Sequence, residues 1–445
     1  MAARKELLKA QAFVQQRLVA ALVDREPDDP TPPLRRLGLG LFVSVLVAAL
    51  VVAGFGIYGL IKKPKTTKWS EPNTIVVDTT AGITFVTPDG KKLHPVTNMA
   101  SARLITGGDR IVTVTTASLS NVPRGEPYGI REAPAQLPDP GAMAPLPMRV
   151  CSLPAGTNAR HTVLDFGAPA PSSTIMVALK NLAGDKYLVV DGVAHLVKPA
   201  AEKAIDVRMV LTPAADALIA SLPSGAPLSP IVPEDKGNTV RGGRHIGDVV
   251  RVGDAGDEAS QSYWLLLGSG WSQISYLDMR ITYGGDAPFV PEAEVRQNIS
   301  PDKPDSRTPG IPHRKVPGSE ADTTRTTVCA TYVPGSANPL VTVGTDVALT
   351  AAEKARQPAM TSYDRVTTTP GGGAMLRGEG TPAEGTSFLV WEGRKYGIPD
   401  TVSRVSLGYG TEPAVGVVNQ RVLAMIPDGL PSGVALDREH ANRPV

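Results

Sequence analysis

The sequence predicts an α+β protein that is mostly β, preceded by an N-terminal amphipathic helix and a single transmembrane helix. Three observations predict this class. Residues 37–61 contain no charged side chain, a strand–glycine turn–strand unit recurs four times beyond them, and glycine and proline supply 44 and 41 of the 445 residues. So much glycine and proline favours short strands joined by turns over long helices.

The uncharged run at 37–61 has the length and composition of a membrane-spanning helix. At about 1.5 Å per residue it would extend roughly 37 Å, more than the roughly 30 Å of a bilayer's hydrocarbon core. A cleaved signal peptide is the alternative, but the run is long, starts far from Met1 and is followed by no small-residue cleavage motif. Basic residues are equally numerous near both ends, so the positive-inside rule leaves the orientation open.

Residues 4–24 have the pattern of an amphipathic helix. Apolar side chains recur at steps of seven and four, at Leu7, Val14, Leu18 and Leu22, and this spacing places them on one face. Such a helix either lies on membrane lipid headgroups or docks onto another subunit, and the sequence favours neither alternative.

The repeated unit consists of two apolar runs joined by a tight glycine turn. It occurs at residues 83–96, 187–197, 263–274 and 387–398. Glycine tolerates the positive φ that hairpin turns require. Short helix candidates follow the first, second and fourth copies at 98–105, 200–205 and 400–405, and residues 217–225 resemble 422–429. We therefore expect four related α+β modules with some internal two-fold character.

The two cysteines, Cys151 and Cys329, each lie in a strand-like run that follows a proline-rich loop. Their spacing fits no zinc or Cys-x-x-Cys pattern, which leaves two inert core thiols or one long-range disulfide. The disulfide is the favoured alternative, and it would place the large domain in an oxidising compartment.

No catalytic or cofactor motif is present in the sequence. It contains no GxxxxGK[ST] phosphate loop, no HExxH zinc motif and no GxSxG nucleophile motif. A net charge of +2 gives no indication of a nucleic-acid surface. His94 and His195 follow the hairpin turn at equivalent places in two modules, which suggests a structural role in the repeat. We expect no catalytic, cofactor-binding or metal-binding residues.

The sequence resembles the EccB family of the type VII (ESX) secretion systems of actinobacteria. The resemblance runs from end to end, and the residues that carry it are the helix at 8–22, LHPVTNMASARLI at 93–105, Cys151, LGYG at 407–410 and IPDGL at 426–430. The stretch at 93–105 is its most specific part.

The resemblance implies a structural core subunit of an inner-membrane export complex, built with the EccC motor ATPase, EccD and EccE. It also implies a cytoplasmic tail, a periplasmic domain of four modules around a central β region, closure of that domain by a disulfide, and self-association through it. The domains we expect are a tail at 1–36, the transmembrane helix at 37–61, a linker at 62–75 and the periplasmic repeat domain at 76–445. The alternatives are an ATP hydrolase without a recognisable phosphate loop, for which ATP would be the cofactor, and a cell-wall-binding module.

Overall fold

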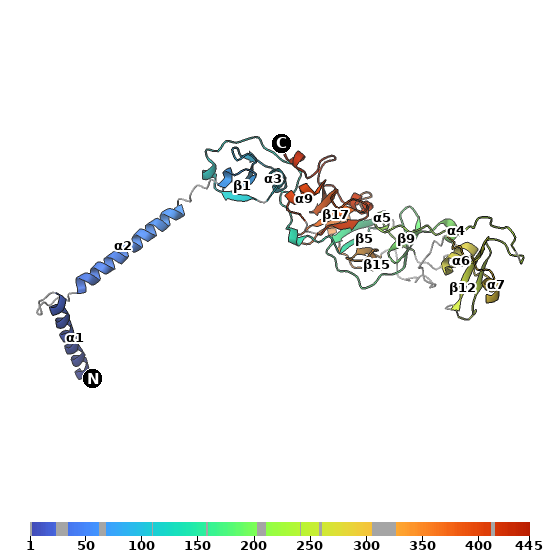
Figure 1. Cartoon of the computed structure of the whole chain (residues 1–445), viewed down its shortest axis with the longest axis horizontal. Coiled ribbons are helices and arrows are strands. Elements are labelled where there is room, and N and C mark those ends of the chain that lie inside the picture. The colour runs from blue at the N-terminus through green and yellow to red at the C-terminus, as the bar shows by residue number, and fades with distance from the viewer. Residues whose placement is uncertain are drawn as a thin grey trace. The chain divides into compact units, whose positions relative to one another are not determined.

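The computed structural model divides the chain into two compact units, Met1–Thr67 and Lys68–Val445 (Figure 1). The structure describes residues 2–23, 34–61, 68–108, 110–156, 159–202, 211–240, 242–257, 260–304, 326–410 and 414–445. Residues 62–67 of the expected linker and 203–205 of the second helix candidate lie outside the described residues.

The first unit contains two helices, α1 (Ala2–Val23) and α2 (Leu34–Ile61). None of the helices in the described part of the chain has the combination of length and hydropathy that crossing a membrane requires. The prediction of a transmembrane helix at 37–61 is therefore corrected.

The second unit begins with module 1, a sheet of strand order β3-β2-β1-β4. Its elements are β1 (Thr74–Asp78), β2 (Ile83–Thr87), β3 (His94–Pro95), α3 (Met99–Thr106) and β4 (Ile111–Val114). Three strands form an antiparallel meander, and the chain then passes through α3 to place β4 parallel to β1. The Asn98 side chain caps the start of α3, and Gly107 ends it with a φ of 72°.

Modules 2 and 4 repeat this topology, with orders β10-β7-β8-β9 and β19-β18-β17-β20. In both, the last strand lies parallel to the first. Module 2 comprises β7 (Val177–Lys180), β8 (Lys186–Val190), β9 (Val193–Leu196), α4 (Pro199–Glu202), β10 (Leu211–Pro213) and α5 (Asp216–Ser221). Module 4 comprises β17 (Ala374–Gly378), β18 (Ser387–Trp391), β19 (Arg394–Ile398), α9 (Thr401–Ser406), β20 (Gly416–Val418) and α10 (Gln420–Met425).

Module 3 is the most divergent copy. It comprises β11 (Val249–Val252), β12 (Ser262–Leu267), β13 (Gly270–Ile274), α6 (Tyr276–Tyr283) and α7 (Glu292–Arg296). A single parallel bridge between Arg251 and Phe289 stands where the other modules have a fourth strand. The backbone N–H of Arg251 donates to Pro288 at 3.0 Å, and its carbonyl accepts from Val290 at 2.9 Å. The four modules thus share one chain path. Helix α6 of module 3 was not among the helix candidates that the sequence predicted.

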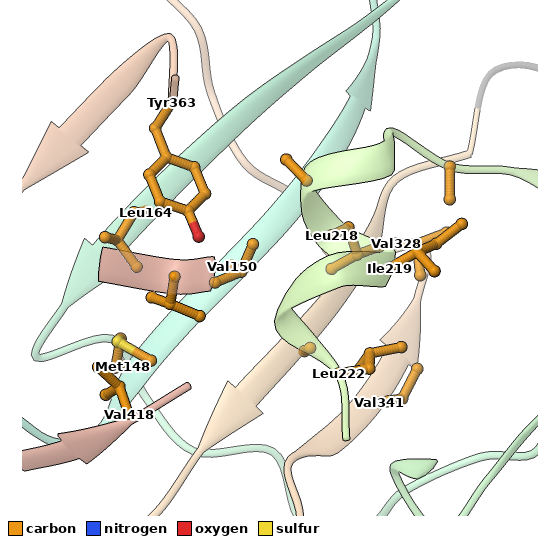
Figure 2. Packing of buried hydrophobic residues seen from close by; sticks show 14 of the residues in the cluster. Met148, Val150, Leu164, Leu218, Ile219, Leu222, Val328, Val341, Tyr363 and Val418 are labelled. Carbon is orange, nitrogen blue, oxygen red and sulfur yellow. The ribbon is translucent and has the colours of Figure 1, made fainter. Parts of the chain in front are cut away.

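A central sheet of order β15-β14-β5-β6-β16 combines strands from both sides of modules 2 and 3 in the sequence. These strands are β5 (Met148–Pro154), β6 (Arg160–Phe166), β14 (Val328–Tyr332), β15 (Leu340–Val343) and β16 (Arg365–Thr367). Its core also takes side chains from modules 2 and 4. Figure 2 shows Leu218 and Ile219 of α5, and Leu222 directly after it, beside Val328 and Val341. The remaining labelled side chains of this core are Met148, Val150, Leu164, Tyr363 and Val418.

Helices make the contacts between modules. Module 1 packs through α3 against α9 and α11 (Arg438–Ala441) of the C-terminal part, burying Leu104 and Leu407 in one cluster. Helices α10 and α5 join modules 4 and 2, and α4 and α6 join modules 2 and 3. The remaining elements are α8 (Ala351–Ala355) and the 3₁₀ turns η1 (Lys68–Ser70), η2 (Thr116–Leu119) and η3 (Pro140–Ala142).

The fold class is therefore mixed α/β with several small sheets, and the prediction of a mostly β domain is wrong. The physical reason is that a sheet of three or four short strands cannot cover its own apolar face. In modules 1, 2 and 3 the helix that follows the hairpin contributes buried side chains to the clusters that cover this face.

Candidate functional site

The two cysteines lie opposite each other on neighbouring strands of the central sheet. Cys151 of β5 pairs in register with Cys329 of β14, and their sulfur atoms are bonded at 2.06 Å. Both side chains are fully buried, and the Cα atoms are 4.1 Å apart. The bond spans 178 residues, a loop that contains modules 2 and 3. It therefore braces the sheet at the point where the chain leaves for these modules and returns from them.

A buried arginine and a serine form hydrogen bonds where the same sheet meets module 2. Arg160 is 4% exposed, and its guanidinium donates to the Ser152 hydroxyl at 3.1 Å, the Ser152 carbonyl at 2.9 Å and the Thr326 carbonyl at 2.5 Å. The Ser152 hydroxyl also accepts from the backbone N–H of Ala215, just before α5, at 2.9 Å. Burial lowers the pKa of Arg160 to about 10, so the side chain stays charged at neutral pH. No sequence motif marks this group, and sequence reasoning missed it.

Aromatic rings lie over glycines at equivalent positions of the repeat. His94 and His195 each place Nδ1 3.0 Å from a backbone carbonyl, that of Glu126 and that of Ala226. A Cβ atom added to Gly125 would lie 2.2 Å from the His94 ring, and one on Gly225 would lie 2.3 Å from the His195 ring. These glycines belong to the segment that returns beside the third strand of each module. The histidines are therefore packing residues of the repeat.

Module 4 uses a tyrosine for the same contact, and module 3 replaces both partners. A Cβ on Gly429 would meet the Tyr396 ring at 2.3 Å. In module 3 the returning segment bonds to Trp271 through Asn298 and Ser300, so Ser300 stands where the other modules have glycine. The matching ring position there is Ser272. A recurring Pro-x-Gly, at 123–125, 223–225 and 427–429, is the sequence feature that could have identified these contacts.

The expected docking residues lie in one helix and face solvent. Leu7, Val14, Leu18 and Leu22 of α1 are 70%, 59%, 59% and 76% exposed. Other apolar side chains of α1 are exposed as well, among them Leu8 and Phe13, which do not share the row formed by the first four. The apolar surface of α1 therefore extends beyond a single stripe.

A hollow of about 630 Å³ lies beside the start of α3 in module 1. Asn98 and Arg103 in its wall form hydrogen bonds that stabilise the fold. Asn98 accepts from the backbone N–H of Ser101 at 2.8 Å and donates to the Ile130 carbonyl at 2.6 Å. Arg103 donates to the Leu407 carbonyl of module 4 at 2.7 Å. Among the residues that the structure describes, no group of three or more His, Cys, Asp or Glu side chains is placed to hold a metal ion.

Repetition of a small α/β module, a disulfide-braced central sheet and packing residues at the repeat positions define a modular scaffold. The family described as "Type VII secretion system ESX-1, transport TM domain B" (EccB) matches residues 2–443 of this chain. The chain belongs to this EccB family of type VII secretion components.

Curated relatives carry the same family name. The ESX-3 secretion system ATPase EccB3 of Mycolicibacterium smegmatis is 28% identical over 153 residues, which is 34% of this chain and 29% of that protein. The ESX-2 secretion system ATPase EccB2 of Mycobacterium tuberculosis is 27% identical over 273 residues, 56% of this chain and 54% of that protein. The aligned segments therefore span about half or less of these relatives' length.

Solved structures share the fold. A chain of an intact ESX-5 inner membrane complex has a TM-score of 0.64 and 22% identity, covering 99% of this chain and 95% of that chain. The EccB3 dimer from the ESX-3 core complex has a TM-score of 0.62 and 24% identity, covering 83% of this chain and 100% of that chain. At these identities the likeness shows a common architecture.

Proposed function

We propose that this chain is a structural core subunit of an ESX inner-membrane complex, needed for its assembly and for protein export. The observation that carries the proposal is the family match across residues 2–443, which includes the exposed helix α1 together with the folded unit. The partners we propose are the motor ATPase EccC, EccD, EccE and a second copy of this chain. We place the disulfide-bonded unit on the periplasmic side, where an oxidising environment keeps such bonds intact.

The contacts in the folded unit support a scaffold role. Buried polar groups such as Arg160 and Asn98 are engaged in joining strands, helices and modules. In the described part of the chain these groups brace the architecture and do not converge on a common reacting point. Helix α1 supplies exposed apolar side chains, Leu7, Val14, Leu18 and Leu22, of the type that another subunit would cover.

ATP hydrolysis is the second candidate, because the curated relatives are named ATPases. The sequence contains no GxxxxGK[ST] motif, whose backbone amides and lysine hold the phosphates in P-loop enzymes. An ATPase built on this chain would need a different phosphate-binding arrangement.

The test is affinity purification of the full chain from gently solubilised membranes, followed by identification of the co-purifying proteins and assay of phosphate release. Recovery of a large P-loop motor with multi-span partners supports the scaffold role. A chain recovered alone would overturn it. Phosphate release that persists after the motor is removed would favour the ATPase.

A further inference from the structure

Most edges of the sheets in the described part of the chain are closed by neighbouring segments. The returning segment of each module covers its third strand, as in the bond from the Leu93 N–H to the Pro123 carbonyl. On the outer side of β15, the Val341 carbonyl accepts a hydrogen bond from the Ile175 N–H at 3.0 Å. Residues 288–290 cover the outer side of β11. Closed edges prevent unintended strand pairing. An edge without such cover is therefore informative.

Strand β4 of module 1 presents an open edge. Ile75 donates to the Arg110 carbonyl at 2.8 Å, and Thr79 donates to the Val114 carbonyl at 3.0 Å. The backbone groups of successive strand residues point to opposite sides. Those of Ile111 and Thr113 therefore point away from β1, and within the described residues they meet no partner strand.

The equivalent strands of the other modules are protected from pairing. In β10, the backbone N–H of Ala214 donates inward to the Lys180 carbonyl at 2.9 Å, so the preceding residue, Pro213, faces outward. Proline has no N–H to donate at this outward position. In β20, only Val417 faces outward, because Glu379 bonds to the Val418 carbonyl. Strand β4 contains no proline, glycine or charge, and Ile111 is 43% exposed.

We propose that β4 pairs antiparallel with β4 of a second copy of this chain, about a two-fold axis at Val112. This inference rests on the self-association included in the proposed function and identifies its surface. The register pairs Ile111 of one copy with Thr113 of the other, so that both outward residues of each copy exchange N–H···O bonds. Val112 then faces its own counterpart, and Arg110 faces Val114.

This register is self-complementary. The paired residues carry no charge, and Arg110 is engaged in an ion pair with Glu71 of its own copy. Like charges therefore do not oppose each other across the axis. Because the axis is two-fold, each hydrogen bond between the edges occurs twice, once from each copy. The contact therefore uses the same surface on both copies.

The experiment uses the full chain with Val112→Cys. A residue on the axis of an antiparallel pair without hydrogen bonds lies about 4.5 Å from its counterpart by Cα, within disulfide reach. We expect mild oxidation to give a covalent dimer on non-reducing gels. The matched control is Ile83→Cys, 44% exposed on β2 of the same sheet, which should remain monomeric on the gel.

A second pair of variants tests the hydrogen bonds. Thr113→Pro removes the outward N–H at an edge position that tolerates proline, whereas Thr113→Val keeps it. We expect the proline variant to self-associate about tenfold more weakly, because two symmetry-related bonds are lost, and the valine variant to be unchanged. Equal thermal unfolding of the two variants would show that both are folded.

Three results would overturn the inference. They are a dimer without a Val112 cross-link, equal association of the proline and valine variants, and cross-linking of Val112 to a different protein. In each of these cases the proposed scaffold role stands. A chain that stays monomeric even within the purified complex would instead remove self-association from the proposed function.

Discussion

At the scale of single residues, the repeat depends on a ring packed against a glycine. Gly225 lies under the His195 ring, and the same contact is made by Gly429 with Tyr396. Neither glycine is at a positive φ, so the requirement for glycine there is one of space. Module 3 satisfies the same position with Ser272 and Ser300, which indicates that the two positions change together.

We expect Gly225→Ser to lower the free energy of unfolding by about 1–3 kcal/mol, because the new side chain overlaps the His195 ring. Adding His195→Ser should make room for it, so the double variant should lose less than the sum of the two single changes. Chemical denaturation measures this. Gly285→Ser is the control, since nothing lies within 4 Å of a Cβ there. Strictly additive losses would contradict the pairing.

At the scale of elements, the disulfide and the central sheet join two segments of the chain that lie before and after modules 2 and 3. Strand β5 precedes modules 2 and 3, and β14 follows them, yet the two strands pair over five residues, and Cys151 opposite Cys329 is one of these five pairs. Their pairing requires a loop of 178 residues to close. Loop closure of this kind is entropically costly, and a covalent link reduces the disorder of the unfolded chain.

We expect replacement of Cys151 and Cys329 by alanine to lower the free energy of unfolding by up to about 5 kcal/mol, the chain-entropy figure for so long a loop. Thermal unfolding of the oxidised protein measures the loss. A reducing agent should destabilise the original chain and leave the double variant unaffected. Equal sensitivity of the two proteins to reduction would contradict a stabilising role for this bond.

At the scale of the whole molecule, the family match places an exposed helix and a modular folded unit in one secretion component. Leu7, Val14, Leu18 and Leu22 of α1 face solvent in the isolated chain. Apolar surface of this kind is covered in assemblies, because its burial contributes most of the association free energy.

We expect glutamate at Leu7, Val14 and Leu18 to release the chain from its partners. Each lost apolar contact would cost about 1.5–3 kcal/mol, so recovery of partners in affinity purification should fall to background. Gln15→Glu adds a charge to the same helix at a polar position and should leave recovery unchanged. Partner recovery that survives the triple change would show that α1 is not the docking element.

Local chemistry made parts of the architecture readable from the sequence. Apolar runs around Gly90 and Gly192 predicted hairpins because tight turns demand specific residues. The helix candidates at 98–105 and 400–405 formed, and the structure shows that the Asn98 and Asp400 side chains cap their first turns. Helix α6, the reduced fourth strand at Phe289 and the helix-covered sheets were not apparent, since they depend on packing between distant segments.

The sequence by itself determined the repeated hairpins, the family resemblance and the residues available for a disulfide, because turns, caps and motifs are local. The tertiary structure decided the mixed α/β class, the register that places Cys151 against Cys329 and the hydrogen bonds of buried Arg160 with Ser152 and Thr326. It also decided that the histidine rings lie over glycines about thirty residues further along the chain. These features require strands and helices far apart in sequence to meet, and only the balance of burial and hydrogen bonding over the whole fold selects those meetings.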